Sequence, residues 1–124
     1  MTYQGFPPSY RILKSREFDA VFKNNSVRVS NASFLILAMA THNEKHRLGL
    51  VVSKKTAGCA VFRNRVKRQV RENFRTSQFL QALPRKFDIL VLTRPGVARL
   101  DKQSMAENLT GLFEQLCRKA GSVS

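Results

Sequence analysis

The chain has 124 residues, of which 22 are Lys or Arg and 8 are Asp or Glu, so its formal net charge is +14 at pH 7. A hydrophobic fraction of 43% with nine Phe residues excludes wholesale disorder. No apolar run reaches the roughly 20 residues that a membrane-spanning helix needs. We therefore expect a single soluble domain over residues 1–124, with a polyanion as its partner and no membrane contact.

The first ten residues, with Pro7 and Pro8 among them, read as a flexible extended arm. They lack the charged start and apolar stretch of a signal peptide, so we expect a cytoplasmic protein. In that reducing compartment Cys59 and Cys117, which have no CxxC spacing, are expected to be free thiols.

A short helix is predicted over residues 15–23, with Ser15 as its N-cap. Phe18, Val21 and Phe22 share one face at helical spacing. From the spacing alone, Phe18 and Phe22 are interpreted as core residues, because aromatic pairs on one helix face usually pack together.

Two strands are predicted next, after a polar segment over residues 24–32 that breaks the pattern. Residues 34–40, FLILAMA, read as a buried strand, and residues 47–53, RLGLVVS, as a second strand that is antiparallel to the first if the turn is a hairpin. In the turn, His42 and His46 are expected to be solvated. No Cys or carboxylate cluster completes a metal site around them, so we predict no metal ligands.

The most basic stretch is a predicted helix over residues 60–75, in which six of the last thirteen residues are Arg or Lys. Its apolar face consists of Val66, Val70 and Phe74. Beside that face lies a row of basic side chains, with two more nearer to solvent: Arg63, Lys67, Arg71 and Arg75, then Arg65 and Arg68. Glu72, four residues after Arg68, offers the only local relief from repulsion.

Such a charge run is usually a solvated helix face. Here Arg outnumbers Lys five to one, and Arg suits bidentate contacts to phosphate. We therefore interpret the helix as a nucleic-acid surface, which turns repelling cations into attractive contacts with release of counterions. Lys54 and Lys55, at the end of the second strand, also suit phosphate binding.

Residues 87–93 form a third predicted strand, so the basic helix lies in a strand–helix–strand crossover that implies a parallel pair. Asp101 is the predicted N-cap of a last helix, and residues 120–124 are a short tail. The last helix carries an apolar stripe of Met105, Leu109, Leu112, Phe113 and Leu116. The predicted class is α+β, with a small mixed sheet and about three helices.

No catalytic set is recognisable: the sequence has no Ser, His and carboxylate constellation, no phosphate-binding Gly loop and no HExxH. We expect no catalytic residue in this chain and no cofactor bound by the protein alone.

The segments RLGLVVSKK at residues 47–55 and AVFRNRVKRQVRE at residues 60–72 resemble the protein component of bacterial ribonuclease P. The resemblance covers roughly residues 10–118 and includes the order of the predicted elements. It implies a left-handed crossover around the basic helix, against the usual right-handed rule. It also implies an accessory subunit of a ribonucleoprotein whose catalytic RNA, with bound Mg²⁺, removes the 5′ leader from precursor tRNA. No obligate protein partner is evident.

The resemblance also implies two sets of binding residues. The set expected to meet the catalytic RNA is Arg63, Asn64, Arg65, Lys67 and Arg68, with Arg71 beside them on the helix. The set expected to line the leader path is Phe18, Phe22, Ser53, Lys54, Lys55 and Arg94, which reverses the core interpretation of the two Phe. Some family members have Tyr where Leu37 stands here, so a third stacking contact is not expected from that position.

Three hypotheses follow from different classes: the ribonuclease P subunit, a ribosomal-type structural RNA-binding protein, and a nuclease acting alone. The basic composition fits the first two equally, and only the RNRVKR context and the aromatic first helix separate them. The third lacks catalytic residues.

Overall fold

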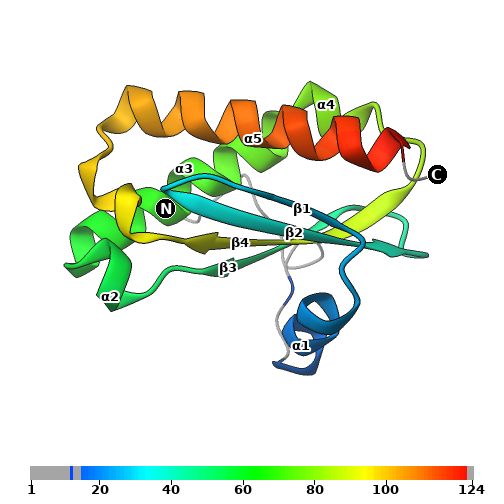
Figure 1. Cartoon of the computed structure of the whole chain (residues 1–124), viewed down its shortest axis with the longest axis horizontal. Coiled ribbons are helices and arrows are strands. Elements are labelled where there is room, and N and C mark those ends of the chain that lie inside the picture. Colours follow the sequence, from blue (N-terminus) through cyan, green and yellow to red (C-terminus); the bar gives the residue numbers. More distant parts are fainter. Residues whose placement is uncertain (1–11, 13–14, 123–124) are drawn as a thin grey trace, which may run out of the picture.

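In a computed structural model, which describes residue 12 and residues 15–122, the protein consists of a four-stranded sheet with helices on both faces (Figure 1). The three longer helices are α1 (Ser15–Asn24), α3 (Ala60–Thr76) and α5 (Lys102–Ser122). The strands are β1 (Val27–Ser30), β2 (Phe34–Thr41), β3 (Arg47–Val51) and β4 (Lys86–Thr93). The other elements of the described residues are two single turns, α2 (Lys54–Ala57) and α4 (Gln78–Gln81), and the 3₁₀ turn η2 (Pro95–Arg99). The predicted α+β class is confirmed.

The strand order is β1-β2-β4-β3, with β4 antiparallel to β2 and parallel to β3. The parallel pair confirms the predicted crossover through α3, and the hand of that crossover stays a prediction. β3 runs antiparallel to β2, but the two strands do not form the hairpin on which that prediction depended, because β4 lies between them. Strands two places apart are about 10 Å from each other, and the loop over residues 42–46 is long enough to step across β4.

The edge strand β1 was missed in the sequence, where residues 24–32 read as polar. Val27 and Val29 are buried while Arg28 and Ser30 are exposed, and the strand pairs antiparallel with β2. Two buried side chains in four residues are too short a run for alternation to be recognised.

The main core lies between the sheet and the layer of α3 and α5. Val66, Val70 and Phe74 of α3 are buried there, as predicted. The predicted stripe of α5 is also buried throughout: Met105, Leu109, Leu112, Phe113 and Leu116. A smaller cluster on the opposite face packs α1 against the sheet through Val21, Leu37 and Leu90. Figure 1 shows α1 and α5 on opposite faces of the sheet.

The ends of the helices follow local chemistry. Asp101 accepts a hydrogen bond from the Ser104 amide at 2.8 Å, as expected of the N-cap of α5. That backbone bond lowers the pKa of the Asp101 carboxyl.

The predicted tail is wrong for residues 120–122, because α5 continues to Ser122 and Ala120 packs against the core. The predicted N-terminal arm lies outside the described residues. None of the described helices is long and apolar enough to span a bilayer.

Candidate nucleic-acid interface

The basic side chains of α3 surround its buried stripe in the order that the helical spacing predicts. Arg65 and Arg68 are exposed. Arg63, Lys67 and Arg71, closer to the stripe, are partly buried, and Asn64 is exposed beside them. The helix therefore fixes its position with one face and presents guanidinium groups on the other.

Charge compensation along α3 differs from the prediction. Glu72 pairs with Arg75 instead of Arg68. Arg63 donates to the carbonyl of Gly58, which ends α2 with a positive φ of 69° that suits glycine. Arg65 and Arg68 make no ion pair with any residue that the structure describes. Their charges are directed to solvent or to a partner.

The other face of the sheet carries successive cross-strand rows, set by the pairing of β2, β4 and β3. Met39, Asp88 and Arg47 form one row, and Leu37, Leu90 and Gly49 form the next. Leu35, Leu92 and Val51 form a third, which we name the apolar strip. The residues of the apolar strip are half-buried, whereas Leu37 and Leu90 are buried beneath α1. The strip is therefore apolar surface that α1 leaves partly accessible.

The two aromatic rings of α1 have different environments. An added Cβ on Gly49 would lie 2.9 Å from the Phe18 ring, so Phe18 is seated on the sheet backbone. Phe22 is 44% exposed. Glu17 and Phe22 lie about 140° apart on a helix, and Glu17 bonds to Arg47 in the first row, so Phe22 emerges on the side of α1 away from that bond.

The predicted strand-end residues come together at one edge of the sheet, since β3 and β4 are parallel and both end there. The backbone is extended at Ser53 and Arg94, so both continue the alternation onto the α1 face beyond the apolar strip. The Ser53 hydroxyl accepts from the Thr56 amide at 3.2 Å and caps α2, whose Lys54 and Lys55 are exposed. Ser53 thereby positions two cations near the end of the strip.

The sequence model of the ribonuclease P family matches residues 6–117. The chain belongs to the ribonuclease P protein family.

Relatives and solved structures agree with this assignment. The ribonuclease P protein component of Marinobacter nauticus is 42% identical over 114 residues, covering 92% of this chain and 83% of the relative. That of a Marinomonas species is 39% identical over 121 residues, covering 97% and 89%. The Thermotoga maritima RNase P protein matches with a TM-score of 0.71 at 33% identity, covering 85% and 96%. The Staphylococcus aureus protein matches with a TM-score of 0.70 at 30% identity, covering 90% and 94%.

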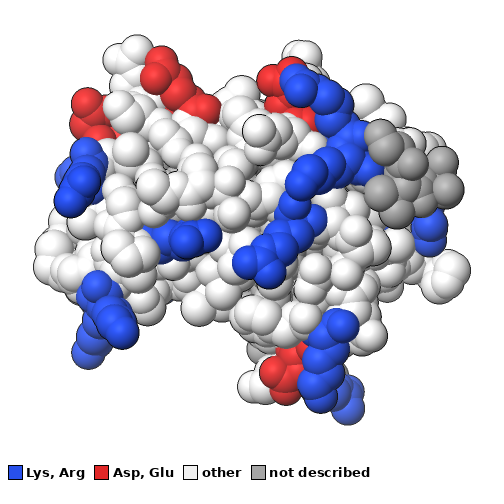
Figure 2. All heavy atoms as spheres, in the orientation of Figure 1, with Lys and Arg blue, Asp and Glu red and all other residues white. Residues whose placement is uncertain are grey.

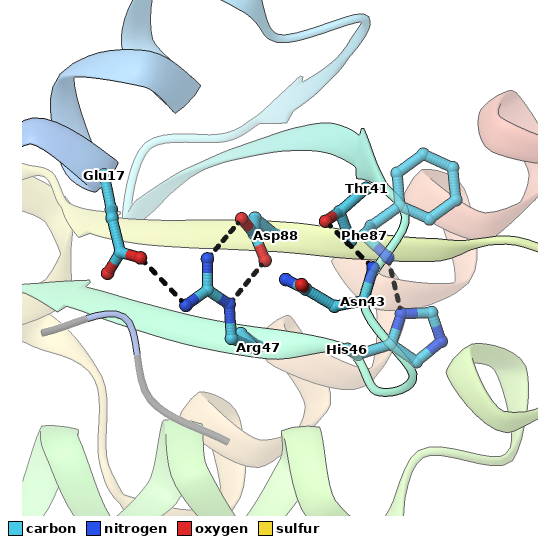
Figure 3. A network of polar contacts seen from close by, with 7 residues as sticks. All are labelled: Glu17, Thr41, Asn43, His46, Arg47, Phe87 and Asp88. Atoms are coloured by element: carbon cyan, nitrogen blue, oxygen red, sulfur yellow. Dashed lines mark hydrogen bonds and ion pairs between the residues drawn. The ribbon is translucent and has the colours of Figure 1, made fainter. Parts of the chain in front are cut away.

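In this member of the ribonuclease P family, a charged network joins α1 to the sheet (Figure 3). Arg47 donates to both carboxylate oxygens of Asp88, through Nε at 2.9 Å and through Nη2 at 2.8 Å. Its Nη1 donates to Glu17 of α1 at 3.1 Å. Asp88 is only 3% exposed, so the bidentate pair provides its buried carboxylate with a partner. The bonds to Asp88, with a smaller contribution from Glu17, raise the pKa of Arg47. Sequence reasoning missed this network, because its members are far apart in the chain.

His46 corrects a second prediction, since it is half-buried and bonded instead of solvated. Its Nδ1 accepts from the Phe87 amide at 3.0 Å, so Nε2 carries the proton and donates to the carbonyl of Leu80 at 2.8 Å. Burial, reinforced by the charge of Lys86, lowers the pKa of this imidazole. His46 therefore fastens the β2–β3 loop to the start of β4 and to α4. His42 is exposed, as predicted.

The described cysteines are free thiols, as predicted. Cys59 precedes α3 and is exposed, and the Phe62 amide lowers the pKa of its thiol. Cys117 is half-buried, and burial raises its pKa to about 11. Within residues 15–122 there is no group of three or more His, Cys, Asp or Glu side chains arranged to hold a metal ion.

Figure 2 shows a further band of basic side chains on the face where β1 and the end of α5 lie. Arg28, Arg118 and Lys119 line the groove between these elements. Part of this charge is engaged within the protein, because Arg118 pairs with Glu114 and Lys119 donates to the carbonyl of Arg28. The sequence does not reveal the band, because Arg28 lies 91 residues before Lys119.

Proposed function

We propose that this chain is the RNA-binding subunit of ribonuclease P, with α3 binding the catalytic RNA and the α1 face of the sheet binding the 5′ leader of precursor tRNA. The observation that carries the proposal is the separation of two surfaces by the sheet. One presents exposed guanidinium groups on α3, and the other presents an exposed ring beside an apolar strip that leads to cations. The surfaces approach each other where β3 ends and α2 leads into α3.

The chemistry of the second surface suits a single strand. Unpaired bases stack on aromatic side chains, and the backbone phosphates follow a line of cations. Phe22 and the apolar strip provide the stacking surface, while Lys54, Lys55 and Arg94 provide the charge. Because stacking tolerates any base, this surface would accept leaders of different sequence.

We further propose that cleavage takes place in the RNA, that Mg²⁺ is held through the RNA, and that the holoenzyme acts in the cytoplasm. The lack of a recognisable catalytic set in the sequence and the membership of the ribonuclease P family support this division of labour. The protein's contribution is then to bind both RNAs and to neutralise their phosphates.

The leader surface is tested by Phe22→Ala in the reconstituted holoenzyme, with precursor and mature tRNA compared on one preparation. Precursor binding should weaken by about 1–3 kcal/mol, the value of one stacked base, while mature tRNA, which has no leader, should bind as before. Phe79→Ala is the matched control, because Phe79 of α4 is a similarly exposed ring, at 40%, outside the proposed surface. Equal precursor affinities for the two variants would contradict leader binding at Phe22.

A further inference from the structure

We infer that Glu17 and Arg47 are positioning residues for leader binding. Their ion pair holds α1 at the distance from the sheet, and in the rotation about the helix axis, that place Phe22 beside the apolar strip. The inference rests on the proposed leader surface and adds the device that sets its geometry. No leader atom need touch either residue.

The network in Figure 3 has two halves with different surroundings. The Asp88 half is buried within the sheet, where its bidentate geometry fixes the plane of the Arg47 guanidinium. The Glu17 half spans from the sheet to the helix, and its carboxylate side chain is 29% exposed. The sheet thus presents a rigid donor, and α1 docks onto it with one carboxylate.

The contacts of α1 with the sheet leave room for such control. Val21 is fully buried against the sheet, and Phe18 is seated over Gly49, so α1 lies on a narrow apolar stripe. A helix held along one stripe can roll about its axis. Glu17 and Phe22 flank Val21 on opposite sides of the helix, so fixing Glu17 at Arg47 also fixes the side on which Phe22 emerges.

Gly49 provides a second, independent control of the same position. A Cβ at this residue would lie 2.5 Å from Cδ2 of Leu90, which is buried beneath α1, and 2.9 Å from the Phe18 ring, so both side chains would have to move. Gly49→Ala should therefore push α1 away from the sheet, while the hydrogen bonds of Arg47 to Asp88 stay in place.

The test compares Glu17→Gln, Gly49→Ala and Phe22→Ala holoenzymes. For Glu17→Gln and Gly49→Ala we expect a loss of about three- to tenfold in precursor affinity, the factor by which a reduced population of the docked helix lowers apparent affinity. Affinity for mature tRNA and for the RNA subunit should stay within about twofold of the unmodified protein. Glu17→Asp, which keeps the charge, should recover part of the loss. Amide hydrogen exchange should accelerate in α1 of the Glu17→Gln protein but not in β2 or β4.

The outcomes separate this inference from the function on which it rests. If Phe22→Ala weakens precursor binding and Glu17→Gln does not, the positioning role is overturned and the leader surface stands. If neither variant changes precursor binding, both are overturned. A parallel loss of melting temperature and of all three affinities in Glu17→Gln would assign the ion pair to stability alone. Asp88→Asn, which removes the buried negative charge that pairs with Arg47, is expected to show that parallel loss and serves as the reference for a purely structural effect.

Discussion

Replacing Arg65 and Arg68 by Ala removes two cations from the exposed side of α3 without disturbing its packing. Both side chains are exposed, whereas the buried stripe of Val66, Val70 and Phe74 is untouched. Ala is a strong helix former, and fewer like charges reduce repulsion along the helix. The melting temperature should therefore be unchanged or slightly higher, and any loss of RNA affinity is a property of the interface.

The size of that loss follows from counterion release. Each phosphate contact contributes about 0.7 to 0.9 to the slope of log K against log salt, so two lost contacts should reduce the slope by about 1.4 to 1.8. If the variant and the unmodified protein bind the RNA subunit equally well in 1 M salt, this change of slope makes the variant bind about 40-fold more weakly in 0.1 M salt and about sevenfold more weakly in 0.3 M salt. The deficit narrows at higher salt because the free energy gained by releasing each counterion falls as the bulk salt concentration rises.

The assay is filter binding or fluorescence anisotropy of the RNA subunit across this salt range. The matched control is Arg85→Ala with Arg118→Ala, two exposed arginines outside α3 whose removal lowers the net charge by the same amount. At 0.1 M salt, where screening limits interactions beyond about 10 Å, the control should lose less than about threefold. Equal slopes for the α3 variant and the unmodified protein, or equal losses in the control, would refute a specific phosphate interface on α3.

Two further predictions follow from titrating side chains. Because the pKa of His46 is lowered in the folded protein, the unfolded chain binds more protons than the folded one at mildly acid pH. The free energy of unfolding should therefore fall as the pH drops from about 6.5 through the folded pKa. The loss is at most about 1.4 kcal/mol per pH unit. Urea melts between pH 7 and 5 should show this loss, and His46→Gln should remove it whereas His42→Gln should not; identical pH profiles in all three proteins would contradict the assigned bonding. Cys59 should react with a thiol reagent at pH 7.5 much faster than Cys117, because the pKa values are shifted in opposite directions and only Cys59 is exposed. Binding of the RNA subunit should protect Cys59, which lies one turn before Arg63, and undiminished labelling in the complex would place the RNA elsewhere.

The elements that the sequence predicts well are those whose information is local. The stripe of Val66, Val70 and Phe74 and the cap at Asp101 depend on residues within a few positions of one another, and both are confirmed. The same helical spacing predicts that Arg65 and Arg68 are exposed, as they are. Local periodicity therefore located the surface of α3 before any tertiary contact was known.

The features that the sequence did not reveal depend on pairing between distant segments. The position of β4 between β2 and β3 is a matter of strand order, which the pattern of buried residues leaves open when a strand is buried on both faces. His46 was expected to be solvated because its partners, Leu80 and Phe87, are 34 and 41 residues away. The bond of Arg47 to Glu17 spans 30 residues in the same way. Spacing placed Phe18 and Phe22 on one helix face, and only the fold separates a ring seated on Gly49 from one that is 44% exposed.

The proposed division of labour between protein and RNA is tested by reconstitution from purified protein, RNA subunit and precursor tRNA, with each component omitted in turn over a range of Mg²⁺ concentrations. We expect no cleavage by protein rigorously freed of RNA, slow cleavage by the RNA subunit that requires high Mg²⁺, and efficient cleavage at low Mg²⁺ only when both are present. Metal-dependent removal of the leader by the protein alone, or a Mg²⁺ requirement of the RNA that the protein does not lower, would contradict it.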